Sequence, residues 1–129
     1  MTRFWSKEFF EKAGELLNND QDLTKVFAGI NTTILVKCID KESAFLISVK
    51  DGNISSREAT AEDKAEFSFA APYDKWVKIV KGEETMQREV MKSNVKFRGS
   101  MPKMLLYLNK VVRMQRKILS IVEEMSLEY

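Results

Sequence analysis

The sequence contains no histidine and only one cysteine, Cys38, among its 129 residues. The absence of histidine removes the commonest general base and the commonest metal ligand of proteins. A single cysteine cannot form an intrachain disulfide, and zinc sites built from cysteine and histidine are excluded. Cys38 itself lies in an apolar segment, where a free cysteine is usually a buried and inert core residue.

Other signs of catalysis are also missing. The five glycines are spread along the chain, so there is no Gly-rich phosphate-binding loop. The adjacent carboxylates Glu83-Glu84 and Glu123-Glu124 should point in different directions on a helix, which does not make a catalytic pair. We therefore expect a protein that is not an enzyme and that carries no cofactor and no metal.

Long apolar runs are absent as well. No stretch approaches the roughly 20 apolar residues that span a membrane, and the N-terminal segment lacks the apolar run of a signal peptide. We therefore expect a cytoplasmic protein. The length is typical of one domain, which we expect to cover residues 1–129, and 44% hydrophobic with 31% charged residues is an ordinary globular composition.

Acidic residues are missing from one part of the chain. The net charge is only +2, but residues 90–122 contain no Asp or Glu and eight basic residues. Lys110, Arg113 and Lys117 lie on one side of a predicted helix, which is either an ordinary solvated face or a surface that attracts anionic membrane headgroups. We expect no nucleic-acid binding, because aromatic residues are not interleaved with the basic ones and the total charge is modest.

Apolar periodicity predicts two helices followed by strands in the first half of the chain. Ser6 can cap the first helix and Asp20 a short second one. Alternation with a period of two then predicts strands within residues 30–39, 44–50, 53–60 and 65–71, with a hairpin turn at Asp51-Gly52. We expect an antiparallel meander with one apolar face and with its third strand near an edge.

Helical spacing returns in the second half. A helix follows Pro72, a short helix covers residues 83–92, and a short strand ends at Gly99. Ser100 can cap the last helix, which we expect to run from about Met101 to Glu124 with a broad apolar arc. The chain is therefore predicted to be an α+β protein that ends in a long apolar helix.

Methionines and one glutamine stand out in this second half. Methionine side chains are flexible, so they either fill a core or line a surface that fits variable apolar shapes. Gln115 falls among apolar residues on the helical wheel and needs a polar partner, either a backbone group or the headgroup of a ligand in a cavity. The methionines concerned are Met86, Met91, Met101, Met104 and Met114.

A particular order of residues also appears in this half: Phe67-Ser68-Phe69, then Asp74, Trp76 and Gly82, then Val95-Lys96-Phe97-Arg98-Gly99-Ser100-Met101, then Leu105 and Leu108. In this order the chain resembles the sterol carrier protein type 2 (sterol-transfer) domain family. The resemblance covers about residues 32–119. Asn94 stands where that family usually has glycine, and asparagine also tolerates a left-handed backbone.

The resemblance implies a sheet of about five antiparallel strands, covered on one face by helices, with a lipid-binding tunnel between the two layers. The ligand would be a fatty acid, an acyl-CoA, a sterol or an isoprenoid, and the role would be that of a lipid carrier. The residues expected to line the tunnel are Ile34, Val36, Phe45, Ile47, Phe67, Phe69 and Phe97 on the sheet, and Trp76, Met86, Met91, Met104, Leu105, Leu108, Val112 and Gln115 on the helices. The alternative is a non-enzymatic interaction module with a filled core, whose last helix packs against a partner or a second copy in a homodimer.

Overall fold

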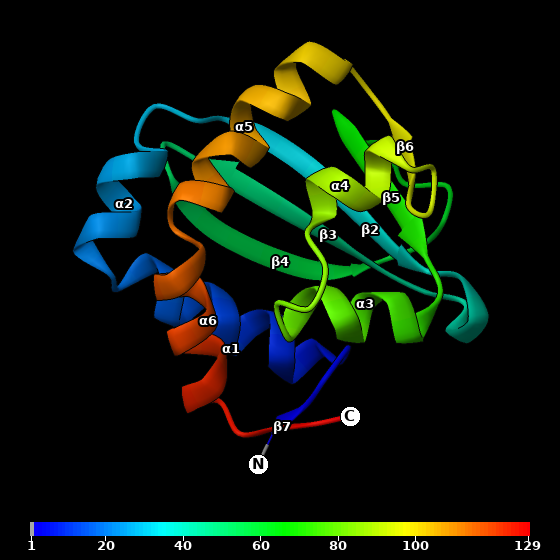
Figure 1. Ribbon diagram of the computed structural model, residues 1–129, viewed down its shortest axis with the longest axis horizontal. Coiled ribbons are helices and arrows are strands. Elements are labelled where there is room, and N and C mark those ends of the chain that lie inside the picture. Colours follow the sequence, from blue (N-terminus) through cyan, green and yellow to red (C-terminus); the bar gives the residue numbers. More distant parts are fainter. Residues whose placement is uncertain (1) are drawn as a thin grey trace.

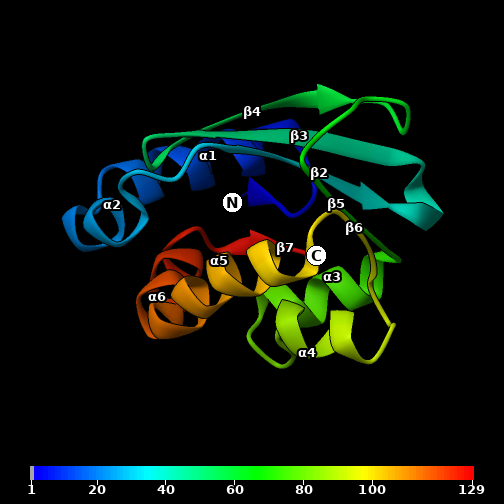
Figure 2. The ribbon, with the colours of Figure 1, turned by 90° about the horizontal axis from the view of Figure 1, so that it is seen from above.

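The computed structural model describes residues 2–129 and places a five-stranded sheet against a layer of helices (Figures 1 and 2). The first two helices, α1 (Lys7–Asn18) and α2 (Gln21–Phe27), begin at the predicted caps. The Ser6 hydroxyl accepts a hydrogen bond from the Phe9 N–H at 3.1 Å, and the Asp20 carboxylate accepts one from the Leu23 N–H at 3.0 Å. Each cap satisfies an N–H group that has no partner within its helix.

The five strands are β2 (Thr32–Cys38), β3 (Ser43–Lys50), β4 (Asn53–Ala59), β5 (Phe67–Ala71) and β6 (Lys96–Arg98), in the spatial order β4-β3-β2-β5-β6. A short 3-10 turn, η1 (Ile39–Lys41), joins β2 to β3. The predicted hairpin turn is confirmed, with φ angles of 48° at Asp51 and 80° at Gly52. Gly52 is also held close to α2, since a Cβ atom there would lie 2.9 Å from the Phe27 carbonyl oxygen. The prediction that β4 lies at an edge is confirmed too.

One pairing differs from the predicted antiparallel meander. Strand β5 does not continue beside β4; it crosses to the other side of β2 and pairs with it in parallel. Phe67 lies opposite Ile34 and Phe69 opposite Val36, so the most apolar segments sit together in the middle of the sheet. Alternation predicts that a strand exists and which face is apolar, but it does not select the neighbouring strand. The sheet is therefore mixed.

Four helices cover the apolar face of this sheet (Figure 2): α3 (Tyr73–Val80), α4 (Met86–Met91), α5 (Met101–Arg113) and α6 (Gln115–Glu124). The prediction of one long C-terminal helix is wrong, because the helix is broken at Met114. An unbroken helix of this length would extend about 36 Å, which is more than the roughly 26 Å of the longest strand. Beyond the break, α6 packs against α1.

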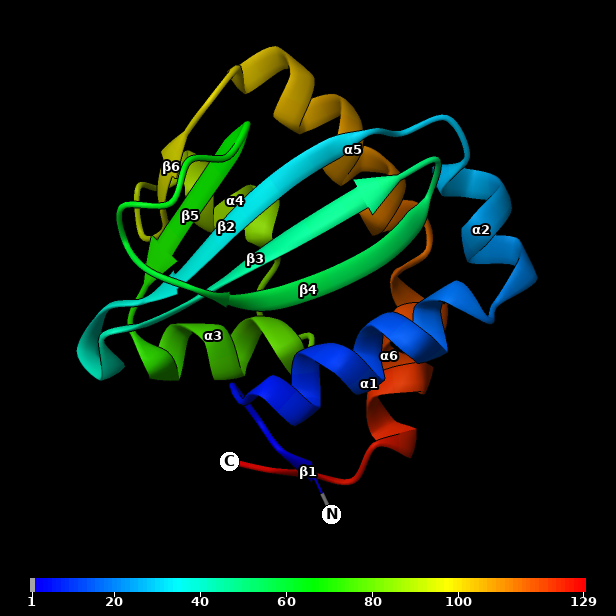
Figure 3. The same cartoon turned by 180° about the vertical axis from the view of Figure 1, so that it is seen from behind.

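The two ends of the chain meet in a second, two-stranded sheet, which the sequence did not predict. β1 (Thr2–Arg3) and β7 (Leu127–Glu128) pair in parallel, and the Phe4 N–H donates to the Glu128 carbonyl oxygen at 2.8 Å (Figure 3). The aromatic ring of Phe4 lies 5.7 Å from that of Tyr129. Strands of two residues carry too few alternating positions to be recognised from a pattern.

The main core lies between the sheet and the helices and is rich in aromatic side chains. Trp76 of α3 is buried within it, and its indole N–H donates to the carbonyl oxygens of Lys37 at 2.9 Å and Ala71 at 3.0 Å. This satisfies the polar atom of a large buried ring and fixes α3 to the ends of β2 and β5. Within residues 2–129 no helix is both long enough and apolar enough to cross a bilayer.

Candidate functional site

Two apolar cavities lie between the sheet and the helices. Cavity 1 has a volume of about 300 Å³ and is bordered by the N-terminal aromatics, by α3 and the start of α4, and by α5 and α6. Cavity 2 has a volume of about 280 Å³ and lies between the strands, α2 and α5. Both are lined almost wholly by aliphatic and aromatic side chains, which is typical of sites for apolar small molecules.

The two cavities adjoin one another. Ile47 of β3, Leu108 and Val111 of α5, and Ile118 of α6 border both of them. We call these four aliphatic side chains the partition. Val111 is also 38% exposed at the surface.

The sheet wall of the cavities follows from strand alternation and register. Ile34 and Val36 lie on the same face of β2, since side chains two residues apart point the same way. Ile34 lies opposite Ile47 on one side and opposite Phe67 on the other. These cross-strand neighbours form a continuous apolar surface that faces α5.

The structure brings most of the predicted lining residues to these cavities. Those that border cavity 1, cavity 2 or both are Ile34, Val36, Ile47, Phe67, Phe69, Trp76, Met86, Met104, Leu108, Val112 and Gln115. That they contact a ligand remains a prediction.

Four predicted residues border neither cavity. Phe45 stacks on Phe10 with 4.2 Å between ring centroids, and both Phe97 and Leu105 pack against the core. Met91 is 63% exposed. It lies five residues after Met86, and a helix turns by about 140° over that interval, so the two methionines face different sides of α4.

Several lining residues were missed by the sequence analysis. Phe4, Trp5, Phe9 and Phe10 border cavity 1, and the missed residues of cavity 2 include Ile54. Four aromatic side chains within seven residues near the N-terminus were a visible signal. Their place could not be predicted, because the pairing of β1 with β7 determines where this segment lies.

Four polar side chains border cavity 1, and we refer to them as its polar edge. Glu84, Thr85 and Gln87 come from the loop before α4 and from its first turn, and Gln115 is the first residue of α6. The Gln115 side chain makes no hydrogen bond within residues 2–129, so it has no backbone partner there. The Gln115 side chain is partly exposed. The polar atoms of Gln115 are therefore available to a ligand or to solvent.

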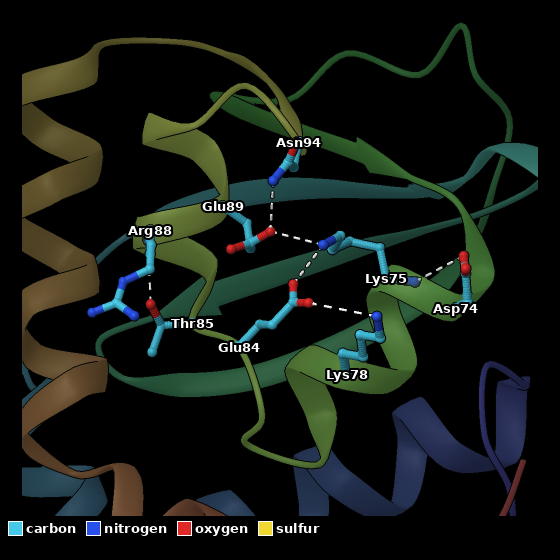
Figure 4. Close-up of polar contacts among 8 residues, drawn as sticks. All are labelled: Asp74, Lys75, Lys78, Glu84, Thr85, Arg88, Glu89 and Asn94. Carbon is cyan, nitrogen blue, oxygen red and sulfur yellow. Dashed lines mark hydrogen bonds and ion pairs between the residues drawn. The ribbon is translucent and has the colours of Figure 1, made fainter.

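A buried ion-pair cluster supports this polar edge (Figure 4). The Lys75 ammonium donates to Glu84 at 2.5 Å and to Glu89 at 2.7 Å, and the Asn94 amide donates to Glu89 at 3.0 Å. The Glu89 side chain is only 4% exposed. Hydrogen bonds from Lys75 and then from Asn94 lower the pKa of Glu89 to about 2. The cluster joins α3, α4 and the loop before β6, and it fixes Glu84 beside the cavity.

The same cluster corrects the interpretation of Asn94. The left-handed residue in this loop is Ser93, with a φ angle of 64°, whereas Asn94 does not have a positive φ. Asn94 instead contributes through its side-chain N–H, which helps to satisfy the buried Glu89 carboxylate. Glycine could not make this hydrogen bond.

Two of the three predicted headgroup contacts have partners within the protein. Lys117 lies 2.5 Å from Asp22 and 3.2 Å from Asp20, and these hydrogen bonds, that of Asp22 first, raise its pKa. Lys110 donates to the Val26 carbonyl oxygen at 3.3 Å. Both lysines thus tie α5 and α6 to α2, whereas Arg113 is exposed.

No group of three potential metal-ligating His, Cys, Asp or Glu side chains occurs among residues 2–129. Cys38 is 1% exposed, and burial first and then its hydrogen bond to Asp40 raise the pKa of its thiol to about 11. A thiol is nucleophilic only as the thiolate, so Cys38 is not activated at neutral pH.

The fold and the cavities define an α+β domain with an apolar interior site, and comparison with known proteins identifies its family. The chain belongs to the SCP-2 sterol transfer family, whose family model matches residues 10–109. No curated protein sequence matches the chain.

Solved structures share the fold at low sequence identity. A crystal structure of sterol carrier protein 2 has a TM-score of 0.76 at 11% identity, over 95% of this chain and 98% of that one. A Thermus thermophilus protein, suggested to be a sterol carrier protein, has a TM-score of 0.73 at 12% identity, over 96% and 90%. An inverting sec-alkylsulfatase from Pseudomonas sp. has a TM-score of 0.56 at 15% identity, over 67% of this chain and 14% of the sulfatase.

Proposed function

We propose that the protein binds one elongated, apolar, lipid-like molecule in the two adjoining cavities and carries it without chemical change. Membership of the SCP-2 sterol transfer family supports a lipid-carrying role. The predicted ligand classes were fatty acids, acyl-CoA esters, sterols and isoprenoids. Each of these gains free energy by withdrawing apolar surface from water, at roughly 25 cal/mol per Å².

The observation that carries this proposal is the apolar partition shared by the cavities. A solid core has few voids larger than a water molecule, yet here two spaces of about 300 and 280 Å³ adjoin across Ile47, Leu108, Val111 and Ile118. Apolar side chains line almost the whole of both spaces, which suits an apolar guest. A ligand that displaces the partition would occupy both spaces.

Leu108 gives the direct test. A Leu108→Glu variant places a charge in the partition, and we expect it to lose saturable binding of a fluorescent fatty-acyl probe. Leu106→Glu is the matched control, since Leu106 lies on the same helix but is 59% exposed and borders neither cavity. Circular dichroism checks that both variants remain folded. Equal binding by both variants would contradict the proposal, as would the absence of saturable binding to the unmodified protein.

The alternative, an interaction module, is favoured by one observation. α5 exposes Leu106, Val111 and Val112, and large exposed apolar side chains that gather on one element mark interaction sites. In that case the protein should form a homodimer that Leu106→Glu weakens, as measured by sedimentation. The two cavities favour the carrier over a module with a filled core.

A further inference from the structure

Most of the polar side chains that border the two cavities belong to cavity 1. Glu84, Thr85, Gln87 and Gln115 border cavity 1 and none of them borders cavity 2. Cavity 2 has only the hydroxyl-bearing side chains of Thr32 and Tyr107 on its border, and the Thr32 hydroxyl is already hydrogen-bonded to Glu66. A ligand with one polar end therefore finds a group of partners for that end in cavity 1, and its apolar chain fits toward cavity 2.

The polar groups of cavity 1 are hydrogen-bonding amides, a hydroxyl and a carboxylate, and no cation is among them. Within the described residues 2–129, neither cavity is bordered by a lysine or an arginine. An anionic headgroup that leaves water needs a cation or several N–H donors in return, and an unpaired charge in an apolar site is costly. Among residues 2–129, Glu84 is the one charged residue that borders either cavity, and its carboxylate has the wrong sign to bind a carboxylate or a phosphate.

Both lysines beside Glu84 are already paired with carboxylates: Lys78 lies 3.9 Å from Glu84, and Lys75 lies closer (Figure 4). Lys75 donates to both Glu84 and Glu89, and Glu89 is almost fully buried. A ligand carboxylate that recruited Lys75 would leave the Glu89 charge without its cation inside the protein. Removing one partner of a buried ion pair is strongly unfavourable.

We propose that the site selects lipids with a neutral hydrogen-bonding head, such as a hydroxyl, over lipids with a carboxylate or phosphate head, and that the head lies between Gln87 and Gln115 in cavity 1. Amide side chains both donate and accept, so together they can satisfy a hydroxyl group completely. This inference rests on the proposed function and narrows its ligand class from all lipids to neutral ones.

The test compares two ligands that differ only in the head, 1-dodecanol and dodecanoate. Each ligand is titrated at pH 8 against the unmodified protein loaded with the neutral probe N-phenyl-1-naphthylamine. Concentrations are kept below those at which the ligand aggregates. At this pH the fatty acid is fully ionised. We expect dodecanol to displace the probe at a concentration at least tenfold lower than dodecanoate.

Three variants test which residues cause the preference for dodecanol over dodecanoate. Glu84→Gln removes the carboxylate beside the cavity and should improve dodecanoate displacement threefold or more relative to dodecanol displacement. Glu83→Gln is the matched control, since Glu83 is exposed and does not border cavity 1, and it should change neither ligand. Gln115→Met should weaken dodecanol displacement threefold or more and so reduce the advantage of dodecanol over dodecanoate.

The outcomes separate this inference from the proposed function. Saturable probe binding with dodecanoate equal to or better than dodecanol would overturn the neutral-head inference and leave the carrier intact. Selective weakening of dodecanoate binding by Arg88→Gln would also overturn the neutral-head inference, because the neighbouring Arg88 would then supply the missing cation. A probe that does not bind saturably would overturn both.

Discussion

At the scale of single residues, Cys38 is a thiol that the fold protects. It is 1% exposed and the pKa of its thiol is raised to about 11. We expect no alkylation by iodoacetamide at pH 8 over the time in which the unfolded chain in urea reacts completely, as followed by mass spectrometry. Rapid modification of the folded protein would show that this part of β2 opens readily.

Glu89 should make stability depend on acid pH. Its folded-state pKa of about 2 lies below the ordinary value, so its ionised form stabilises the folded state. This contribution is complete above the unfolded-state pKa, near 4.3, and is lost as the pH falls toward 2. Urea denaturation at several pH values should show a stability advantage over Glu89→Gln that is full at pH 7 and shrinks below about pH 5. An advantage that does not change with pH would contradict the assignment, and Glu83→Gln serves as the exposed control.

At the scale of elements, α1 protects the exposed edge of the sheet (Figure 3). Asn18 at the end of α1 donates to the Ile54 carbonyl oxygen at 2.8 Å and accepts from the Ile54 N–H at 2.7 Å. An edge strand otherwise presents such groups to water or to another chain. A single amide side chain thus replaces a neighbouring strand at this position of β4.

Asn18→Ala should therefore lower the free energy of unfolding by about 1–3 kcal/mol, because both polar groups of Ile54 lose their partner. Asn19→Ala is the control, since Asn19 is the next residue, is exposed and ends the same helix. Chemical denaturation measures both. Equal effects of the two substitutions would mean that the Asn18 side chain does not stabilise this edge.

The starts of helices could be predicted from the sequence, because they depend on hydrogen bonds between residues close in the chain. Features that depend on tertiary packing could not be predicted. Ser6, Asp20 and Ser100 act as caps through hydrogen bonds within three residues, which is why the sequence alone located them. The break at Met114 involves neither proline nor glycine, and α6 beyond it packs on α1, a tertiary contact that local sequence does not predict. The same limit applies to the site: strand alternation located Ile34 and Val36, whereas Phe4 and Trp5 depend on a pairing between the chain ends.

At the scale of the whole molecule, cavity 1 depends on parts of the chain outside the family match. That match covers residues 10–109, whereas Phe4, Trp5 and Phe9 on one side and the lining residues of α6 on the other fall beyond it. The sheet and most of α5 thus lie within the part of the chain that matches the family model. The chain ends supply much of the wall of cavity 1, where selectivity between ligands is proposed to arise.

The basic surface offers a further prediction at this scale. Arg113 and Arg116 are both exposed, unlike the partly engaged Lys110 and Lys117. An Arg113→Glu, Arg116→Glu variant should bind an apolar probe normally but transfer it to anionic vesicles several-fold more slowly, because attraction to anionic lipids depends on surface charge. Transfer to neutral vesicles is the control. An unchanged rate to anionic vesicles would show that these arginines serve solubility only.

The pairing of β1 with β7 has a consequence for the order of folding. It closes a loop of nearly the whole chain, and the entropy cost of closure grows with loop length. The strands pair over two residues on each side, and Phe4 adds a backbone hydrogen bond to Glu128 and a ring contact with Tyr129, so this contact should form after the five-stranded sheet. Phe4 and Trp5 belong to this late-forming segment. The interior space beside them would therefore be sealed last during folding, and each brief opening of the chain ends would give an apolar molecule a route into it.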